Sequence, residues 1–93
     1  MSVEEIRSRI LPILKRHGAS RAGIFGSVVR GEARDDSDVD VLIEVNSDLT
    51  LLGFIGLKQE LEDALGRSVD LVEYDTLKPR IRNQVLKEQV AII

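Results

Sequence analysis

The chain has 93 residues, 43% of them hydrophobic and 31% charged, a composition typical of a folded domain and not of a disordered segment. Its formal net charge of −3 offers no general attraction to nucleic acid or to an anionic membrane. The absence of cysteine excludes a disulfide framework and a thiolate metal site, and suits the reducing cytoplasm. No apolar run approaches the roughly 20 residues of a membrane span, and the first residues lack a signal-peptide pattern. We therefore expect one cytoplasmic domain over residues 1–93.

The chain begins with a helical pattern. Ser2 followed by Glu5 forms a capping box, which predicts a helix that begins at Val3. Pro12 interrupts the pattern and predicts a kink or a division into two short helices, because proline cannot donate the intrahelical hydrogen bond. Gly18 can adopt the left-handed conformation that commonly ends a helix.

Strand and helix patterns then alternate along the chain. Gly66 marks the end of a helix, and Pro79 suits the first position of the last one. The final V-A-I-I predicts either a strand at a sheet edge or part of a protein interface. Strand patterns cover Ser20–Phe25, Val39–Glu44 and Ser68–Tyr74, and helical patterns cover Gly26–Arg30, Thr50–Leu65 and the residues from Pro79. This order predicts the α/β (α+β) class, a small sheet with helices packed against it.

Two aspartates at the start of the second strand carry the first chemical signal. Asp38 and Asp40 are two residues apart, so both carboxylates point to one face, with Cα atoms about 6.6 Å apart. At an effective dielectric constant of about 20 their repulsion is about 2.5 kcal/mol, which leaves both ionised at neutral pH. Such a pair suits Mg²⁺ or Mn²⁺. If the strand of Asp70 lies beside theirs, three acids converge and can hold two ions, with Asp70 near an attacking hydroxyl whose proton it could accept.

The segment before these acids offers groups for a polyphosphate. Gly26 follows an apolar strand and permits close backbone approach. Ser27 adds a hydroxyl and a backbone N–H at the start of a helical turn. Arg30 lies one turn later and can donate charge-assisted hydrogen bonds to phosphate oxygens. Gly-Ser and D-x-D are each common, but their combination between Gly26 and Asp40 is far more specific.

The stretch G-S-V-V-R-G-E-A-R-D-D-S-D-V-D-V resembles the signature of the polymerase-β-like nucleotidyltransferases, and more closely that of the minimal nucleotidyltransferases, or MntA-type antitoxins. The resemblance implies a small mixed sheet flanked by helices, with Gly26 and Ser27 at the phosphates of ATP. It implies Asp38, Asp40 and Asp70 as catalytic metal ligands, usually for two Mg²⁺ ions. Minimal members typically pair with a HEPN-domain toxin, and some transfer AMP onto its tyrosine. Val29 departs from the pattern, which puts the packing of the turn in doubt.

Simpler interpretations compete at each position. Asp38 and Asp40 could form a solvated acidic turn, and Asp70 could bond to nearby backbone. Arg30 could form a surface salt bridge with Glu32 or Asp36, which would add little stability. The basic cluster of Lys78, Arg80 and Arg82 could reach a nucleotide or an acidic partner, or could be a solvated helix face.

Three functions fit these residues. The first is a Mg²⁺-dependent enzyme that moves a nucleotidyl group from ATP to a hydroxyl of a partner protein, as the antitoxin of a HEPN toxin. The second is an antitoxin that blocks its partner by contact alone. The third, a nucleic-acid polymerising domain, is disfavoured by the acidic charge balance. Association with a second copy is left open.

Overall fold

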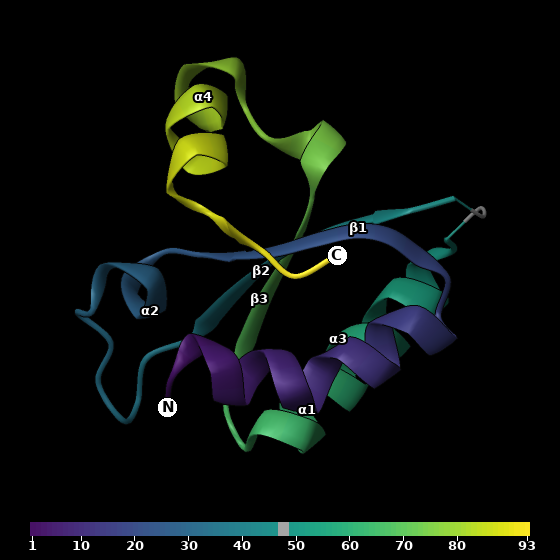
Figure 1. Ribbon diagram of the computed structural model, residues 1–93. Helices are drawn as coiled ribbons and strands as arrows, with labels where there is room; N and C mark the ends of the chain where they lie inside the picture. Colours follow the sequence, from purple (N-terminus) through teal and green to yellow (C-terminus); the bar gives the residue numbers. More distant parts are fainter. Residues whose placement is uncertain (47–48) are drawn as a thin grey trace.

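The computed structural model describes residues 1–46 and 49–93, which form a four-stranded mixed sheet flanked by helices (Figure 1). The strand order is β3-β2-β1-β4; β2 pairs in parallel with β3, whereas β1 pairs antiparallel with both β2 and β4. The predicted α/β class with a mixed sheet is confirmed. The elements in chain order are α1 (Val3–Arg16), β1 (Ala19–Phe25), α2 (Ser27–Arg30), β2 (Val39–Val45), α3 (Leu51–Leu65), β3 (Val69–Glu73), the 3₁₀ helix η1 (Tyr74–Thr76), α4 (Pro79–Glu88) and β4 (Val90–Ala91).

Helix α1 begins and ends where the sequence predicts, but Pro12 does not divide it. The Ser2 hydroxyl accepts the Glu5 backbone N–H at 3.1 Å, and Gly18 has a φ of 79° after the helix. Pro12 lies on the exposed side, opposite the buried Ile10. Because the apolar side of the helix is buried against the sheet, packing outweighs the one backbone hydrogen bond that the proline removes. Of the two outcomes predicted for Pro12, a kink or a division, the division into two helices is wrong.

The two faces of the sheet are covered by different elements. Helices α1 and α3 lie side by side on one face, and η1 and α4 lie on the other (Figure 1). Val41 packs into the main core with α1 and α3, whereas its neighbour Leu42 packs with Tyr74 and Leu77 on the α4 side. This alternation follows from the period of two in a strand. Consecutive residues of a strand therefore face opposite sides of the sheet.

The end of the chain completes the sheet. Gly23 pairs with Ala91 and Ile24 with Val90, so the two-residue strand β4 covers the outer edge of β1. Ile92 then buries its side chain in the main core. Of the two interpretations of V-A-I-I, the sheet edge is the one observed, and it brings the end of α4 next to β1.

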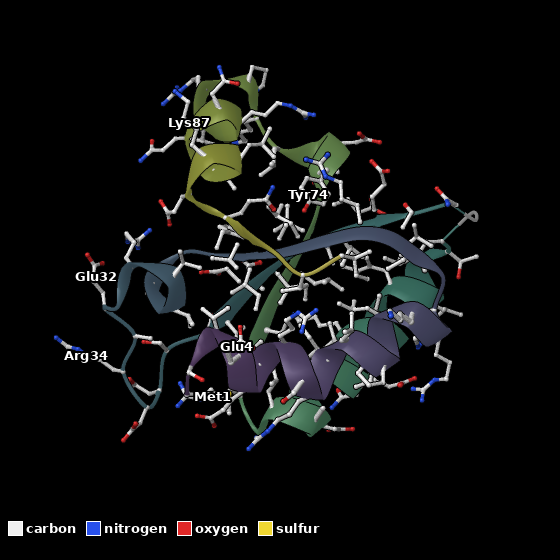
Figure 2. The ribbon with its side chains drawn as sticks, viewed as in Figure 1. Met1, Glu4, Glu32, Arg34, Tyr74 and Lys87 are labelled. Atoms are coloured by element: carbon white, nitrogen blue, oxygen red, sulfur yellow. The ribbon has the colours of Figure 1, made fainter. Side chains whose placement is uncertain are left out.

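Tyr74 connects α4 to the second face of the sheet. Its ring lies between η1 and the sheet and is almost fully buried (Figure 2). The hydroxyl donates to Gln89 Oε1 at 2.7 Å, and the Arg21 guanidinium stacks 4.0 Å from the ring centroid. Arg82 Nη1 donates to the Tyr74 carbonyl at 3.0 Å. These contacts join α4 to the sheet and give Arg82, one of the predicted basic cluster, a structural role, whereas Lys78 and Arg80 are exposed. In the part of the chain that the structure describes, no helix is long and apolar enough to cross a membrane.

Candidate active site

Gly26 forms the sharp turn between β1 and α2. Its φ of 79° is a conformation that residues with a side chain rarely adopt. A Cβ atom at this position would lie only 1.9 Å from Asp40 Oδ2. The carboxylate of Asp40 therefore rests directly on the backbone of the turn. Glycine is required here for two reasons, the left-handed backbone and the space that Asp40 occupies.

Two of the three predicted acids lie opposite each other on adjacent strands. Asp40 on β2 pairs in parallel register with Asp70 on β3, so their Cα atoms are about 4.8 Å apart. Residue alternation places both on the face covered by α4, because Leu42 and Val72, two positions further along each strand, pack on that side. Asp38 comes immediately before β2. The parallel pairing of β2 with β3 is the arrangement that the sequence interpretation required.

The electrostatics of Asp40 show how close the other charges are. Its pKa is raised to about 6, first by burial, then by the negative charges of Asp70 and Asp38, and further by Glu88, while Arg30 opposes the shift. Asp40 is half-buried, and Asp38 and Asp70 are exposed. In the absence of a cation, the site therefore holds an excess of negative charge around one partly desolvated carboxylate.

The fit of these acids to a divalent ion rests on their donors. Carboxylate oxygens are the ligands that Mg²⁺ and Mn²⁺ prefer, and the mutual repulsion at Asp40 is the field that a cation would relieve. Among residues 1–46 and 49–93, no three side chains of the ligating types already lie close enough together to enclose an ion. Because Asp38 and Asp70 are exposed, their side chains are free to turn towards an ion beside Asp40. In chemical type, these carboxylate donors therefore fit a divalent ion.

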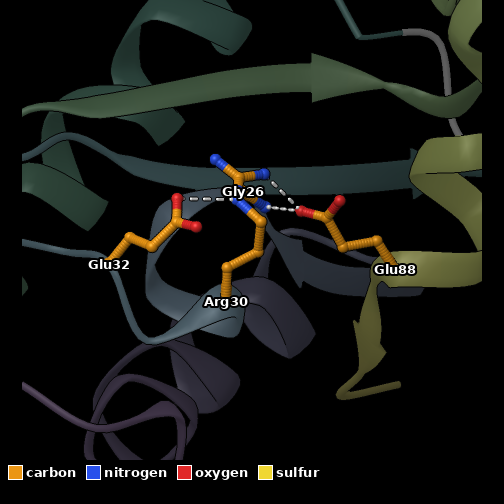
Figure 3. A network of polar contacts seen from close by, with 4 residues as sticks. All are labelled: Gly26, Arg30, Glu32 and Glu88. Carbon is orange, nitrogen blue, oxygen red and sulfur yellow. Dashed lines mark hydrogen bonds and ion pairs between the residues drawn. The ribbon is translucent and has the colours of Figure 1, made fainter.

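Arg30 lies beside the acids and forms the surface salt bridge with Glu32 that the sequence offered as one interpretation, together with a second one to Glu88. Its Nε donates to Glu32 Oε2 at 3.0 Å, which is the predicted surface salt bridge, and Nη1 donates to Glu88 Oε1 at 2.7 Å. Both carboxylates raise the pKa of Arg30, with the hydrogen bond to Glu32 as the largest cause. The Arg30 guanidinium lies between the two acids (Figure 3). Ser27, the first residue of α2, is half-buried beside the same turn.

Glu88 is a site residue that the sequence did not reveal. It is the last residue of α4, and its Oε1 accepts the Gly26 backbone N–H at 3.1 Å as well as the guanidinium of Arg30. No spacing or motif links it to residues 58 and 62 positions earlier. Only the pairing of β4 with β1 brings the end of α4 to the turn.

The predicted site residues lie outside a cavity that the structure shows at the start of two strands. A cavity of about 210 Å³ lies at the start of β2 and β3, near the point where the Val39 N–H donates to the Ser68 carbonyl at 3.0 Å. None of the predicted site residues lines it. Its walls are formed by Asp35, Asp36, Ser37, Gly66, Arg67 and Ser68.

Comparison with known proteins decides the family. The model of the family described as "Polymerase beta, Nucleotidyltransferase" matches residues 8–93. The chain belongs to this family. The nucleotidyltransferase activity expected from G-S-x-x-R and D-x-D is the activity of the family, and the expected resemblance to its minimal members is confirmed by the relatives.

Relatives match this nucleotidyltransferase along nearly all of its length. The protein adenylyltransferase MntA of Thermococcus cleftensis is 43% identical over 96 residues, covering 99% of this chain and 97% of that protein. A provisionally named protein adenylyltransferase of Methanocaldococcus jannaschii is 41% identical over 93 residues and the full length of both chains. A solved structure provisionally described as a minimal nucleotidyltransferase has 46% identity and a TM-score of 0.82, covering 97% of this chain and 95% of its own.

Two more distant structures share the fold of this nucleotidyltransferase. A toxin–antitoxin with AMP-PNP has 24% identity and a TM-score of 0.82, covering 94% of this chain and 72% of its own. A tri-AMPylated HEPN toxin from Shewanella oneidensis in complex with MNT antitoxin has 21% identity and a TM-score of 0.75, covering 97% and 71%. At these identities the likeness concerns the fold alone.

Proposed function

We propose that this nucleotidyltransferase is a Mg²⁺-dependent protein adenylyltransferase, which transfers AMP from ATP to a hydroxyl of a HEPN-domain toxin and so acts as its antitoxin. The observation that carries the proposal is the position of Asp40. It lies opposite Asp70 across the parallel β2–β3 pair and rests on Gly26, where a side chain would collide with it. Acids for a metal and a turn for phosphate are thus parts of one surface, as the reaction requires.

The turn and the helix that follows it would bind the nucleotide. Gly26 allows a phosphate to approach the backbone, and the Ser27 hydroxyl and Arg30 guanidinium can donate hydrogen bonds to its oxygens. Arg30 is suited to this because its side chain is 47% exposed and lies beside the acids without being buried. Together these residues would orient the triphosphate so that its α-phosphate faces Asp40 and Asp70.

Asp38, Asp40 and Asp70 would hold the divalent ions, for which two Mg²⁺ are expected and Mn²⁺ is a second possibility. When bound, the metal would supply positive charge that neutralises the negative charge developing on the α-phosphate. The acceptor hydroxyl oxygen forms a new bond to the α-phosphorus, the bond to the bridging oxygen breaks, and pyrophosphate leaves. Asp70 is exposed and lies opposite Asp40 on the neighbouring strand, which supports a role in taking the proton of the acceptor hydroxyl.

The partner is proposed from the names of the structural relatives. One is a toxin–antitoxin with AMP-PNP, and another contains a HEPN toxin that carries AMP. They support ATP as donor and a protein as acceptor for this chain. We expect the reaction in the cytoplasm, where ATP is available, and we do not expect nucleic acid as a substrate because the chain is acidic.

A transfer assay with the HEPN-domain toxin that we propose as its partner tests the proposal. ATP labelled at the α-phosphate should pass its label to the toxin in the presence of Mg²⁺, whereas label at the γ-phosphate should be released with pyrophosphate. Asp38→Asn combined with Asp40→Asn should abolish transfer, and Asp75→Asn, an exposed acid on η1, should leave it unchanged. If the double variant inhibits the toxin as well as the native chain does, contact alone neutralises the partner and the enzymatic proposal is wrong.

A further inference from the structure

Glu88 occupies the donors that the proposed phosphate site needs. One carboxylate oxygen, Oε1, accepts both the Gly26 backbone N–H at 3.1 Å and Arg30 Nη1 at 2.7 Å (Figure 3). The Glu88 side chain is only 21% exposed, so water has little access to these hydrogen bonds. The second partner of Arg30, Glu32, is 64% exposed and belongs to the loop after α2 (Figure 2). Glu88 therefore contacts both the turn and Arg30 from a mostly buried position, whereas Glu32 contacts Arg30 from an exposed one.

A carboxylate and a phosphate compete for such donors. Both are anions with oxygens that accept hydrogen bonds from guanidinium and backbone N–H groups, and both prefer the same short, charge-assisted geometry. A single N–H of Gly26 cannot serve Glu88 and a phosphate oxygen equally. In addition, Glu88 brings a further negative charge to a surface that already contains Asp38, Asp40 and Asp70, which opposes the arrival of an anionic nucleotide.

We propose that Glu88 is an internal substitute for phosphate, so that the segment Glu88–Ala91 acts as an autoinhibitory strap that withdraws from Gly26 and Arg30 when ATP binds. This inference rests on the proposed function, since it concerns the same phosphate site. It assigns the C-terminal segment to the control of nucleotide affinity and gives Glu88 a role apart from that of the three metal-binding acids.

The attachment of the segment is consistent with such movement. Helix α4 has no fully buried residue, and β4 consists of two residues paired with Gly23 and Ile24. Ile92, buried in the main core, anchors the tail beyond the contact. The hydrogen bond from the Tyr74 hydroxyl to Gln89 Oε1 would have to open together with the strap. Because elements with few buried contacts open at the lowest free-energy cost, the end of α4 can still shift while Ile92 stays in place. The second contact of Arg30, to Glu32, does not involve this segment.

The affinity of Glu88→Gln for nucleotide tests the strap. Glutamine keeps the length and an acceptor oxygen but removes the charge, so Mg²⁺–AMP-PNP should bind about tenfold more tightly in calorimetry, the equivalent of one charge-assisted hydrogen bond no longer displaced. The matched control Glu32→Gln also removes an acid from Arg30, but it should change the affinity by no more than about twofold because the pair is exposed to solvent. Inorganic tripolyphosphate should follow the same order, because the competition concerns phosphate and not the base.

The possible results separate the strap from the proposed function. If the native chain binds AMP-PNP and Glu88→Gln binds equally or more weakly, Glu88 positions Arg30 for the nucleotide and the strap is wrong, while the proposed function stands. If no variant binds AMP-PNP or tripolyphosphate, both proposals fail. Hydrogen exchange of the native chain gives a second measurement that needs no variant. Saturating AMP-PNP should speed exchange in residues 88–91, and slower or unchanged exchange there would overturn the inference.

Discussion

Replacement of Asp40 by asparagine should make the protein more stable while it removes the activity. Burial and the neighbouring acids raise the pKa of the Asp40 carboxyl from its usual 3.8 to about 6 in the folded chain. Its folded-state pKa is raised, so the folded state binds the proton more tightly than the unfolded state does. The free energy of unfolding therefore falls as pH rises from about 4 to 6, and the loss is complete at pH 7. Asparagine has nearly the same shape and no charge to bury.

The size of this effect follows from the pKa. One pKa unit corresponds to about 1.36 kcal/mol, so the raised pKa of Asp40 represents at most about 3 kcal/mol. Asp40 is only half-buried and solvent screens its neighbours, so we expect about 1–1.5 kcal/mol at pH 7. For a chain of this length that is an increase in Tm of about 5–10 °C.

Thermal unfolding in EDTA between pH 3.5 and 7.5 measures the difference. Asp40→Asn and the native chain should melt together at the acid end and diverge from about pH 4 upward, with the variant higher. The exposed Asp75→Asn should follow the native curve throughout. A variant that melts below the native chain at pH 7 would refute the reasoning, because it would mean that Asp40 is stabilised by its surroundings and not strained by them.

Two further substitutions test the packing around the site. Gly26→Ala should cost about 2–4 kcal/mol, since its Cβ would lie 1.9 Å from Asp40 Oδ2 at a φ of 79°. Gly66 has a φ of 67° but no atom within 4 Å of a Cβ, so Gly66→Ala should cost only about 1 kcal/mol. If urea titration gave the two variants equal losses in the free energy of unfolding, the close contact at Gly26 would be contradicted. Tyr74→Phe should lose about 1 kcal/mol with the hydrogen bond to Gln89, and an unchanged urea midpoint would contradict this.

The sequence predicted the elements near the site because their signals are local. The capping box at Ser2, the stop at Gly66 and the first-turn proline at Pro79 each act within a few residues, and each stands where it was expected. Pro12 does not divide α1, because burial of the opposite side of the helix outweighs the local effect of the proline. Leu52 also shows that a local pattern does not determine burial, since it lies in the predicted helix with other apolar residues yet is 81% exposed.

The site itself was only partly predictable. Asp38 and Asp40 follow from strand periodicity, and Asp70 was inferred on the condition that its strand lies beside theirs, which the β2–β3 pairing supplies. The repulsion between Asp38 and Asp40 can be calculated from their spacing in the sequence, but the burial of Asp40 cannot. Burial is the largest cause of the raised pKa of Asp40. Glu88 could not be foreseen, because its place depends on a short terminal strand that returns to β1.

A crystal structure with AMP-PNP and Mn²⁺ tests the central claim most directly. The anomalous signal of manganese should lie about 2.2 Å from carboxylate oxygens of Asp38, Asp40 and Asp70, with the phosphates against Gly26, Ser27 and Arg30. Manganese or nucleotide bound at another place, such as the cavity beside Arg67, with these three acids left in solvent, would contradict the account.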